Sequence, residues 1–333
     1  MSKRIWAILT LMLLCFGLFS CSNRANAPAE TGTSGADPET DIGTDTGSSA
    51  TDKPAPPVQV DLLLFMGATD MAGRGGEEST VECAEGHAYE FRAISDPTKL
   101  YPMSAEFGRN ENKTFGIDDG EEKTGSMVPA FCESYYATTQ TPVIAVSASE
   151  GNTGMQDWTV GNGRMEDAVD RLNAAVSFIR ASETFEVRHI FMIWCQGEAD
   201  VAAGTDVQTY ISRTQALVST MMRFGVEKCL LIQTGNDLSR PAESGAIRKA
   251  QAEMCEKNEA MILISVLFSG LSGMQKASGG YLQEAYDMVG ADAGKNAGNY
   301  VMDPDGYRLT AREPEEKNQY NGTVIDLPVD SWD

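Results

Sequence analysis

The chain has 333 residues and a formal net charge of −22, from 26 basic and 48 acidic side chains. This excess of negative charge argues against nucleic acid, and against an anionic membrane surface, as a binding partner. The length is sufficient for one large domain with a substantial core, even after the N-terminal segments described next are set aside.

The first 20 residues have the pattern of a lipoprotein signal peptide. Lys3 and Arg4 supply positive charge, an apolar run covers residues 5–19, and Ser20 and Cys21 follow. The run is short for a membrane span but suits a signal-peptide core. We therefore expect export, cleavage before Cys21, and a lipid on Cys21 that holds the protein on the extracytoplasmic face of a membrane. An ordinary cleavable signal peptide and an uncleaved anchor are the alternatives.

Residues 22–57 are interpreted as a linker. They consist mainly of Thr, Gly, Ser, Ala, Asp and Pro, with almost no large apolar side chain. Such a segment cannot bury enough surface to offset its chain entropy. The predicted organisation is a signal peptide (1–20), a lipidated cysteine and disordered linker (21–57), and one folded domain (58–333).

The folded part alternates short apolar strands with amphipathic helices. Strands are predicted at 58–66, 142–148, 187–194, 228–233 and 261–268, and helices at 127–138, 165–179, 205–224 and 243–258. This alternation implies right-handed crossovers and a mostly parallel sheet in an α/β fold.

One connection is too long for a simple crossover. The segment 77–125, here called the excursion, is rich in Gly, Asp and Glu and also carries several aromatic residues. Loops at the carboxyl ends of parallel strands form ligand sites, so the excursion is a candidate substrate wall. A surface insertion with its own small core explains it equally well.

Three motifs follow predicted strands. G-A-T-D-M-A-G-R-G (67–75) follows the first strand, S-E-G-N-T-G-M-Q-D-W (149–158) the second, and W-C-Q-G-E-A-D (194–200) ends the third. All three fall where an open parallel sheet assembles its active site.

Together these motifs resemble the sialate O-acetylesterase and acetylxylan esterase branch of the SGNH hydrolases. The M-A-G-R-G and W-x-Q-G-E-x-D pieces carry the resemblance, which covers about residues 58–310. It implies a three-layer, flavodoxin-like SGNH fold with a long insertion after the first strand. It also implies hydrolysis of O-acetyl esters of carbohydrates without a cofactor or metal ion.

The first motif differs from the family pattern at the position of the nucleophile and at the residues on either side of it. Thr69 stands at the position of the family's nucleophilic Ser, and its β-methyl group crowds the approach to the hydroxyl. Ala68 replaces a Gln. Asp70 replaces an Asn, and we expect its carboxylate to oppose the negative charge that develops in the transition state.

The general base is also missing. The resemblance places an Asp-x-x-His near the C-terminus, and we assign residues 296–309 to that position, where no histidine occurs. The chain has only His87, in the excursion, and His189, near the start of the third strand. We expect neither to be catalytic.

Several side chains remain candidates for binding. Besides Thr69, the resemblance points to Gln196 and Glu198 as remnants of the catalytic site, with Glu198 paired to Arg74. Substrate-binding candidates are Gly67, Asp70, Arg74, Gly151, Asn152 and Trp158. Trp158 either stacks on a sugar or belongs to the core. A disulfide between Cys83 and Cys132 is possible, and no zinc spacing is present.

The sequence thus predicts a cell-surface lipoprotein with an esterase-like domain and weak or absent catalysis. Loss of the Ser or the His alone from such a unit removes on the order of 10⁶ in turnover. The alternatives are a non-catalytic glycan-binding protein and an adhesion lipoprotein that uses the domain only as a scaffold. The expected partners are an acetylated glycan and, through the lipid, a membrane.

Overall fold

The computed structural model describes residues 56–76 and 81–309. Within them one sheet has the strand order β3-β2-β4-β1-β5-β6-β7, and every neighbouring pair is parallel except β2 with β3. The strands are β1 (Val58–Gly67), β2 (Ala88–Phe91), β3 (Leu100–Pro102), β4 (Val143–Ser149), β5 (Phe185–Cys195), β6 (Lys228–Ile232) and β7 (Met261–Ser265). All five predicted strands are confirmed, as is the mostly parallel α/β sheet.

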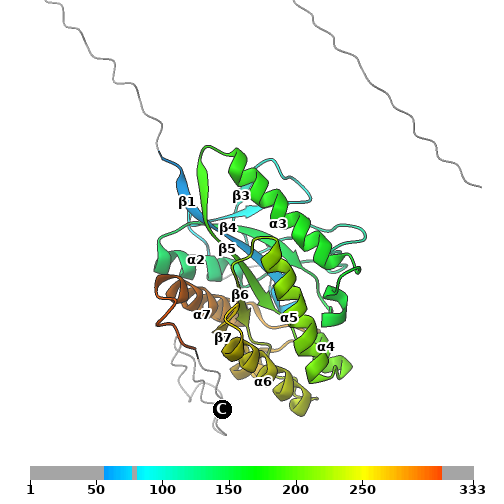
Figure 1. Cartoon of the computed structure of the whole chain (residues 1–333). Helices are drawn as coiled ribbons and strands as arrows, with labels where there is room; N and C mark the ends of the chain where they lie inside the picture. The colour runs from blue at the N-terminus through cyan, green and yellow to red at the C-terminus, as the bar shows by residue number, and fades with distance from the viewer. Residues whose placement is uncertain (1–55, 77–80, 310–333) are drawn as a thin grey trace, which may run out of the picture. The chain divides into compact units, whose positions relative to one another are not determined.

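Helices cover both faces of the sheet and make three layers (Figure 1). One apolar core lies under α3 (Arg164–Ala181), α5 (Val207–Arg223) and α6 (Pro241–Lys257). The other lies under α2 (Val128–Thr139) and α7 (Gln283–Met302). The central strand β1 is buried on both faces from Val60 onward, which explains its continuous apolar run. Short helical turns complete the described elements: α1 (Thr69–Ala72), η1 (Met155–Trp158), α4 (Glu198–Ala203), η2 (Leu267–Gly270) and η3 (Ser272–Met274).

Helix α7 was not predicted, and three glycines at helical spacing explain both its position and why it was missed. A Cβ atom on Gly290 would lie 2.2 Å from the Met127 carbonyl oxygen, and one on Gly294 would lie 2.1 Å from that of Phe131. These glycines let α7 lie directly against α2 (Figure 1). They also remove the apolar periodicity by which a helix is recognised in sequence.

The excursion supplies two strands that were not predicted. Strand β2 pairs in parallel with β4, and β3 pairs antiparallel with β2 at the sheet edge. The buried carboxylate of Glu111 accepts backbone N–H groups of Ile94 (2.8 Å) and Ser95 (3.1 Å), which folds the excursion onto itself. The excursion is therefore an integral part of this domain.

The predicted signal peptide, Cys21 and nearly all of the linker lie outside the described residues. Among the helices that the structure describes, none is both long and apolar enough to cross a membrane.

Candidate active site

A cleft of about 820 Å³ lies at the carboxyl edge of the sheet. Its walls come from the loops after β1, β4, β5, β6 and β7 and from the excursion, as expected for a parallel sheet. The lining residues that the following argument uses are Thr69, Asp70, Arg74, Glu121, Glu122, Asn152, Glu198, Asp237, Lys276 and Tyr281. The three motifs of the sequence therefore meet in space.

Thr69 lines the cleft just after the end of β1. Its Oγ1 accepts the backbone N–H of Asn152 over 3.0 Å. Asn152 adopts a left-handed conformation (φ 59°), which is unusual for a residue other than glycine and costs free energy. Among the described residues, no acceptor takes the proton of the Thr69 hydroxyl. The hydroxyl is held by a donor and has no base beside it.

Gly67 sets the turn that presents Thr69. Its φ is +146°, and a Cβ atom there would lie 1.8 Å from the carbonyl oxygen of Cys195. Only glycine permits β1 and β5 to approach so closely at this point. Gly67 was predicted to bind substrate, but its role in the structure is to bring the loops after β1 and β5 together.

Asp70, which is buried, and Glu198, which is partly buried, form an acidic pair at one wall. The backbone N–H of Asp70 donates to Glu198 Oε1 over 3.3 Å, and Tyr286 donates its hydroxyl to Asp70 Oδ1 over 3.0 Å. Burial, then the charge of Glu198, raises the pKa of the Asp70 carboxyl well above its usual range. Asp70 was expected to add its own negative charge beside the nucleophile position. Instead the pair favours one shared proton.

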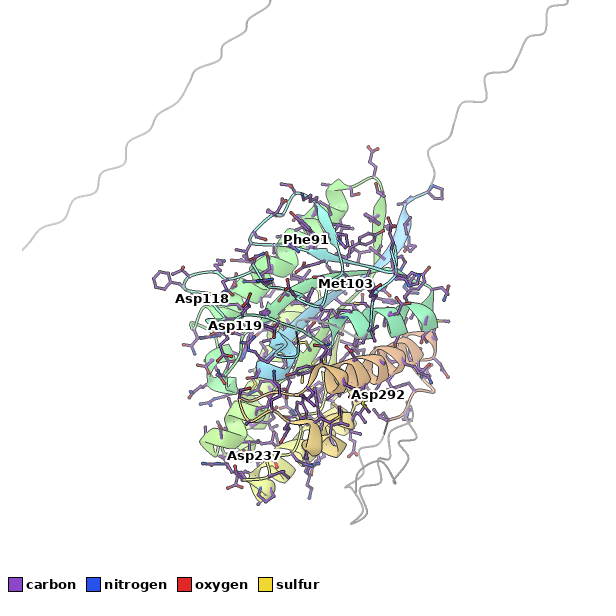
Figure 2. The ribbon with its side chains drawn as sticks, turned by 180° about the vertical axis from the view of Figure 1, so that it is seen from behind. Phe91, Met103, Asp118, Asp119, Asp237 and Asp292 are labelled. Atoms are coloured by element: carbon purple, nitrogen blue, oxygen red, sulfur yellow. The ribbon has the colours of Figure 1, made fainter. Side chains whose placement is uncertain are left out.

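Arg74 does not pair with Glu198 as predicted. Its guanidinium donates to Asp119 Oδ1 (2.5 Å), Glu121 Oε2 (3.0 Å) and the carbonyl oxygen of Glu122 (3.5 Å). All three acceptors belong to the excursion, where Figure 2 shows Asp119. Arg74 thus fixes the excursion to the loop after β1, and the excursion forms a wall of the cleft.

The loop after β7 lines the cleft beside the loop after β1. Lys276 donates its ammonium to the backbone carbonyls of Arg74 and Gly75. Tyr281 is buried, and its hydroxyl accepts a bond from Gln275 Nε2 (2.9 Å). No histidine is present in residues 275–281.

Residues 296–309 were predicted to occupy the place of the family's general base. In the structure they do not line the cleft, so this prediction was wrong. Asn296 lies within α7 and donates to the carbonyl oxygen of Ile264. Tyr307 lies beyond α7 and donates to that of Leu263. Neither residue lines the cleft. Helix α7 carries the chain from the cleft back toward the starts of β6 and β7, so residues 303–309 lie far along the strands from Thr69.

Both histidines lie away from the cleft, as expected. His87 precedes β2, stacks on Tyr136 (3.7 Å between ring centroids) and contacts Glu133 at 2.9 Å. His189 lies in the first half of β5 and contacts Glu227 at 2.9 Å. Because both are at the end of the sheet where β4 and β5 begin, neither can serve Thr69.

Two other candidates belong to the interior. Trp158 is 1% exposed, packs edge-on against Trp194 (5.5 Å between centroids) and donates to Thr153 Oγ1. Its ring is not available to stack on a sugar. Gln196 is fully buried and donates to Asp200 Oδ2 and the Thr153 carbonyl. Gly151 does not line the cleft either.

The cysteines add nothing to the site. All five described cysteines are free, so the possible bond between Cys83 and Cys132 is not formed in the structure. Burial raises the pKa of the Cys195 thiol well above its usual range, which keeps this thiol, beside the cleft, protonated.

Sequence reasoning missed the loops after β6 and β7, including Asp237 and Lys276. Both strands were predicted, and strand ends of a parallel sheet share one edge, so these loops could have been placed at the cleft. The excursion was a candidate substrate wall in the sequence, and it does line the cleft, although nothing in the sequence singled out Glu121 and Glu122 within it.

Comparison with known proteins agrees with this geometry. Residues 59–267 match the family model for carbohydrate esterase, sialic acid-specific acetylesterase. No curated protein matches the chain.

Similar solved structures include a protein of Arabidopsis thaliana, with 18% identity, TM-score 0.56, and coverage of 74% of this chain and 99% of that one. Others are a carbohydrate acetylesterase from Xanthomonas citri (16%, TM-score 0.45, 72% and 56% covered) and a lipase/acylhydrolase from Enterococcus faecalis (14%, TM-score 0.40, 72% and 96%). At these identities the Arabidopsis likeness supports the fold alone.

Proposed function

Because the chain belongs to the sialic acid-specific acetylesterase family of carbohydrate esterases, we propose that it is an exported surface lipoprotein that binds acetylated glycans with little or no hydrolysis. The family and the cleft supply the ligand class. The loss of turnover is inferred from the residues around Thr69.

The observation that carries the proposal is the environment of the Thr69 hydroxyl. A nucleophilic hydroxyl needs an acceptor that removes its proton as it attacks. Thr69 Oγ1 instead receives the N–H of Asn152, and both histidines of the chain are at the other end of the sheet. Without a base, attack on an ester is slow at neutral pH.

The acidic pair adds a second obstacle. Ester cleavage requires donors where the oxyanion forms, and added negative charge there raises the barrier. Asp70 follows the attacking position directly, and its carboxyl lies beside that of Glu198, so two acidic side chains stand next to Thr69. Binding of a neutral ground state is affected much less than formation of an anionic transition state.

The N-terminal sequence supports the location. A positive start, a short apolar run and Cys21 after a small residue are the features that lead to lipid attachment. The linker then separates the domain from the membrane. Mass spectrometry of the purified full-length protein would detect the lipid on Cys21, and its absence in Cys21→Ala serves as the control.

Hydrolysis and binding are measured in parallel. We expect wild type and Thr69→Ala to release nitrophenol from 4-nitrophenyl acetate at the same background rate, while wild type binds acetylated glycans on an array. A rate that is well above background and is lost in Thr69→Ala would contradict the proposal and favour a threonine-dependent esterase.

A further inference from the structure

We propose that Phe115 is a second glycan contact outside the cleft, a ring on which a chain stacks after it leaves the cleft, so that long chains bind more tightly than short ones. Phe115 lies in a turn of the excursion, residues 113–117, here called the tip loop. The inference rests on the proposed glycan binding but concerns a different surface. Its basis is the exposure of Phe115, the rigidity of the tip loop, and the course of the excursion from this loop to the cleft.

Phe115 is the most exposed large apolar side chain among the described residues, with an exposed fraction of 95%. Its backbone is left-handed (φ 65°), which is an outlier for a bulky residue and costs on the order of 1–3 kcal/mol. At this exposure the ring makes almost no packing contact within the domain that could offset the cost. An aromatic ring held outward in a strained conformation indicates a partner outside the domain.

Hydrogen bonds fix the tip loop in place. The backbone N–H of Lys113 donates to the carbonyl oxygen of Ile117 over 2.9 Å. The N–H of Ile117 donates in turn to Oδ2 of the buried Asp167, in the first turn of α3, over 3.0 Å. Because the backbone beneath Phe115 is already ordered, a ligand that stacks on the ring loses little of its binding free energy to ordering the loop.

A second loop adds apolar surface beside the tip loop. A Cβ atom on Gly163 would lie 2.4 Å from the carbonyl oxygen of Phe115, so the two loops are in contact. In the loop of Gly163, Val160 is 75% exposed. Glu166 accepts the N–H groups of Gly161 (2.7 Å) and Gly163 (3.1 Å), which holds this loop as well. An exposed ring with an aliphatic side chain on the adjoining loop suits the apolar C–H face of a sugar.

The excursion leads from the tip loop to the cleft. Asp118 and Gly120 are exposed, and a Cβ atom on Gly120 would meet nothing within 4 Å, so the surface there is open. Figure 2 shows Asp118 and Asp119, which lie between the tip loop and the cleft along the chain. Glu121 already lines the cleft. Even a fully extended chain from Phe115 to Glu121 spans at most about 20 Å, so a short oligosaccharide can contact both.

A glycan fits this surface better than a protein or a lipid surface does. A stable protein interface buries about 800 Å² on each partner, far more than one ring and one aliphatic side chain supply. Insertion into lipid would take water from the exposed carboxylates of Asp118, Glu166 and Asp170, on the excursion and on α3. Sugar hydroxyls can bond to such carboxylates while one face of the sugar stacks on the ring.

An array that carries each O-acetylated glycan backbone as a disaccharide, a tetrasaccharide and a hexasaccharide tests the inference. We expect wild type to bind the longer members more tightly than the disaccharides. Phe115→Ala should bind disaccharides as wild type does and lose about three- to tenfold in affinity for hexasaccharides. The matched control is Phe224→Ala, which removes another exposed ring, 48% exposed, after the end of α5 and before β6 begins. It should keep the wild-type dependence on length.

Two further variants show whether the ring itself is needed. Phe115→Tyr keeps a stacking surface and should keep the length dependence, whereas Phe115→Leu keeps only apolar surface and should lose most of it. Full length dependence in Phe115→Leu would contradict stacking.

The remaining outcomes separate this inference from the proposed function. Equal affinity at all lengths in wild type, or an unchanged length dependence in Phe115→Ala, would overturn the inference and leave glycan binding standing. If Phe115→Ala instead weakened binding of the full chain to phosphatidylcholine vesicles and left the array unchanged, the tip loop would belong to a lipid surface and the inference would be wrong. An array without binding at any length would overturn the proposed function, and the inference with it.

Discussion

The Asp70 backbone N–H donates to Glu198 Oε1 over 3.3 Å, so an acidic pair joins the loop after β1 to the loop after β5. Two carboxyl groups side by side, one of them buried, are unfavourable unless they share a proton or bind a cation. Here Tyr286 supports one oxygen of Asp70, and burial favours the neutral form of that carboxyl.

Asp70→Asn is therefore expected to stabilise the protein at neutral pH. Because the pKa of Asp70 is raised, the folded state binds more protons than the unfolded state above about pH 4. The free energy of unfolding of wild type then falls as pH rises through the raised pKa, by at most about 1.4 kcal/mol per pH unit. An amide keeps a donor for Glu198 and an acceptor for Tyr286 without this loss.

Urea denaturation of wild type and Asp70→Asn between pH 4 and pH 8 measures the effect. The difference in unfolding free energy should grow with pH in favour of the variant. Asp118→Asn, which changes an exposed acid of the excursion, should show little pH dependence in the same comparison. A difference for Asp70→Asn that is constant with pH would show that the carboxyl titrates normally.

If the proposed function is right, Thr69→Ser should hydrolyse esters as little as the wild type does. The substitution removes the β-methyl group, which relieves crowding, but it supplies no proton acceptor. Rates with 4-nitrophenyl acetate should stay within about twofold of background in both proteins. A gain of a hundredfold would mean that steric crowding by the β-methyl group, rather than the lack of a proton acceptor, limits hydrolysis.

The strands and the placement of the three motifs were predictable because parallel α/β sheets obey strong rules. Apolar runs such as residues 62–66 identify buried strands, and their carboxyl ends share one edge. Thr69, Asn152 and Glu198 were therefore brought together correctly from sequence. The family resemblance added the expectation that they belong to a hydrolase site.

Side-chain partners were not predictable by the same rules. Arg74 was paired with Glu198 from the motifs, yet its guanidinium binds the excursion, whose fold depends on local contacts such as those of Glu111. Trp158 was ambiguous because an aromatic residue at a strand end can point either way. The general base was predicted at the wrong residues because α7, whose glycines interrupt its apolar pattern, was not recognised as a helix. The loop before α7, which lines the cleft, was not considered.

Helix α7 offers a direct test of close packing. A methyl group in Gly294→Ala would meet the Phe131 carbonyl oxygen at 2.1 Å, so α7 must move away from α2. We expect a loss of about 1–3 kcal/mol in unfolding free energy. Gly245→Ala in α6 is the matched control, because a Cβ atom there has only the Arg248 side chain nearby, at 3.8 Å. It should stabilise the protein by about 0.5–1 kcal/mol. Equal effects of the two substitutions in chemical denaturation would show that the contact between α7 and α2 accommodates an added methyl group.

Substitutions at Trp158 and at Asn152 should affect protein stability and glycan affinity separately. Trp158→Phe removes the bond to Thr153 and part of the packing against Trp194, so we expect a loss of about 1–3 kcal/mol in unfolding free energy. The glycan affinity of the folded variant should equal that of wild type, because the ring is 1% exposed.

Asn152→Gly should behave in the opposite way. Glycine accepts the left-handed conformation at φ 59°, so the N–H to Thr69 is kept and stability changes by less than about 1 kcal/mol. The cleft loses its exposed amide, and glycan affinity should fall by roughly fivefold, the equivalent of one hydrogen bond. Calorimetry on both variants distinguishes the roles. If Trp158→Phe weakened binding while Asn152→Gly did not, the glycan would have to lie against η1, and the cleft at the carboxyl edge of β1 would not be the binding site.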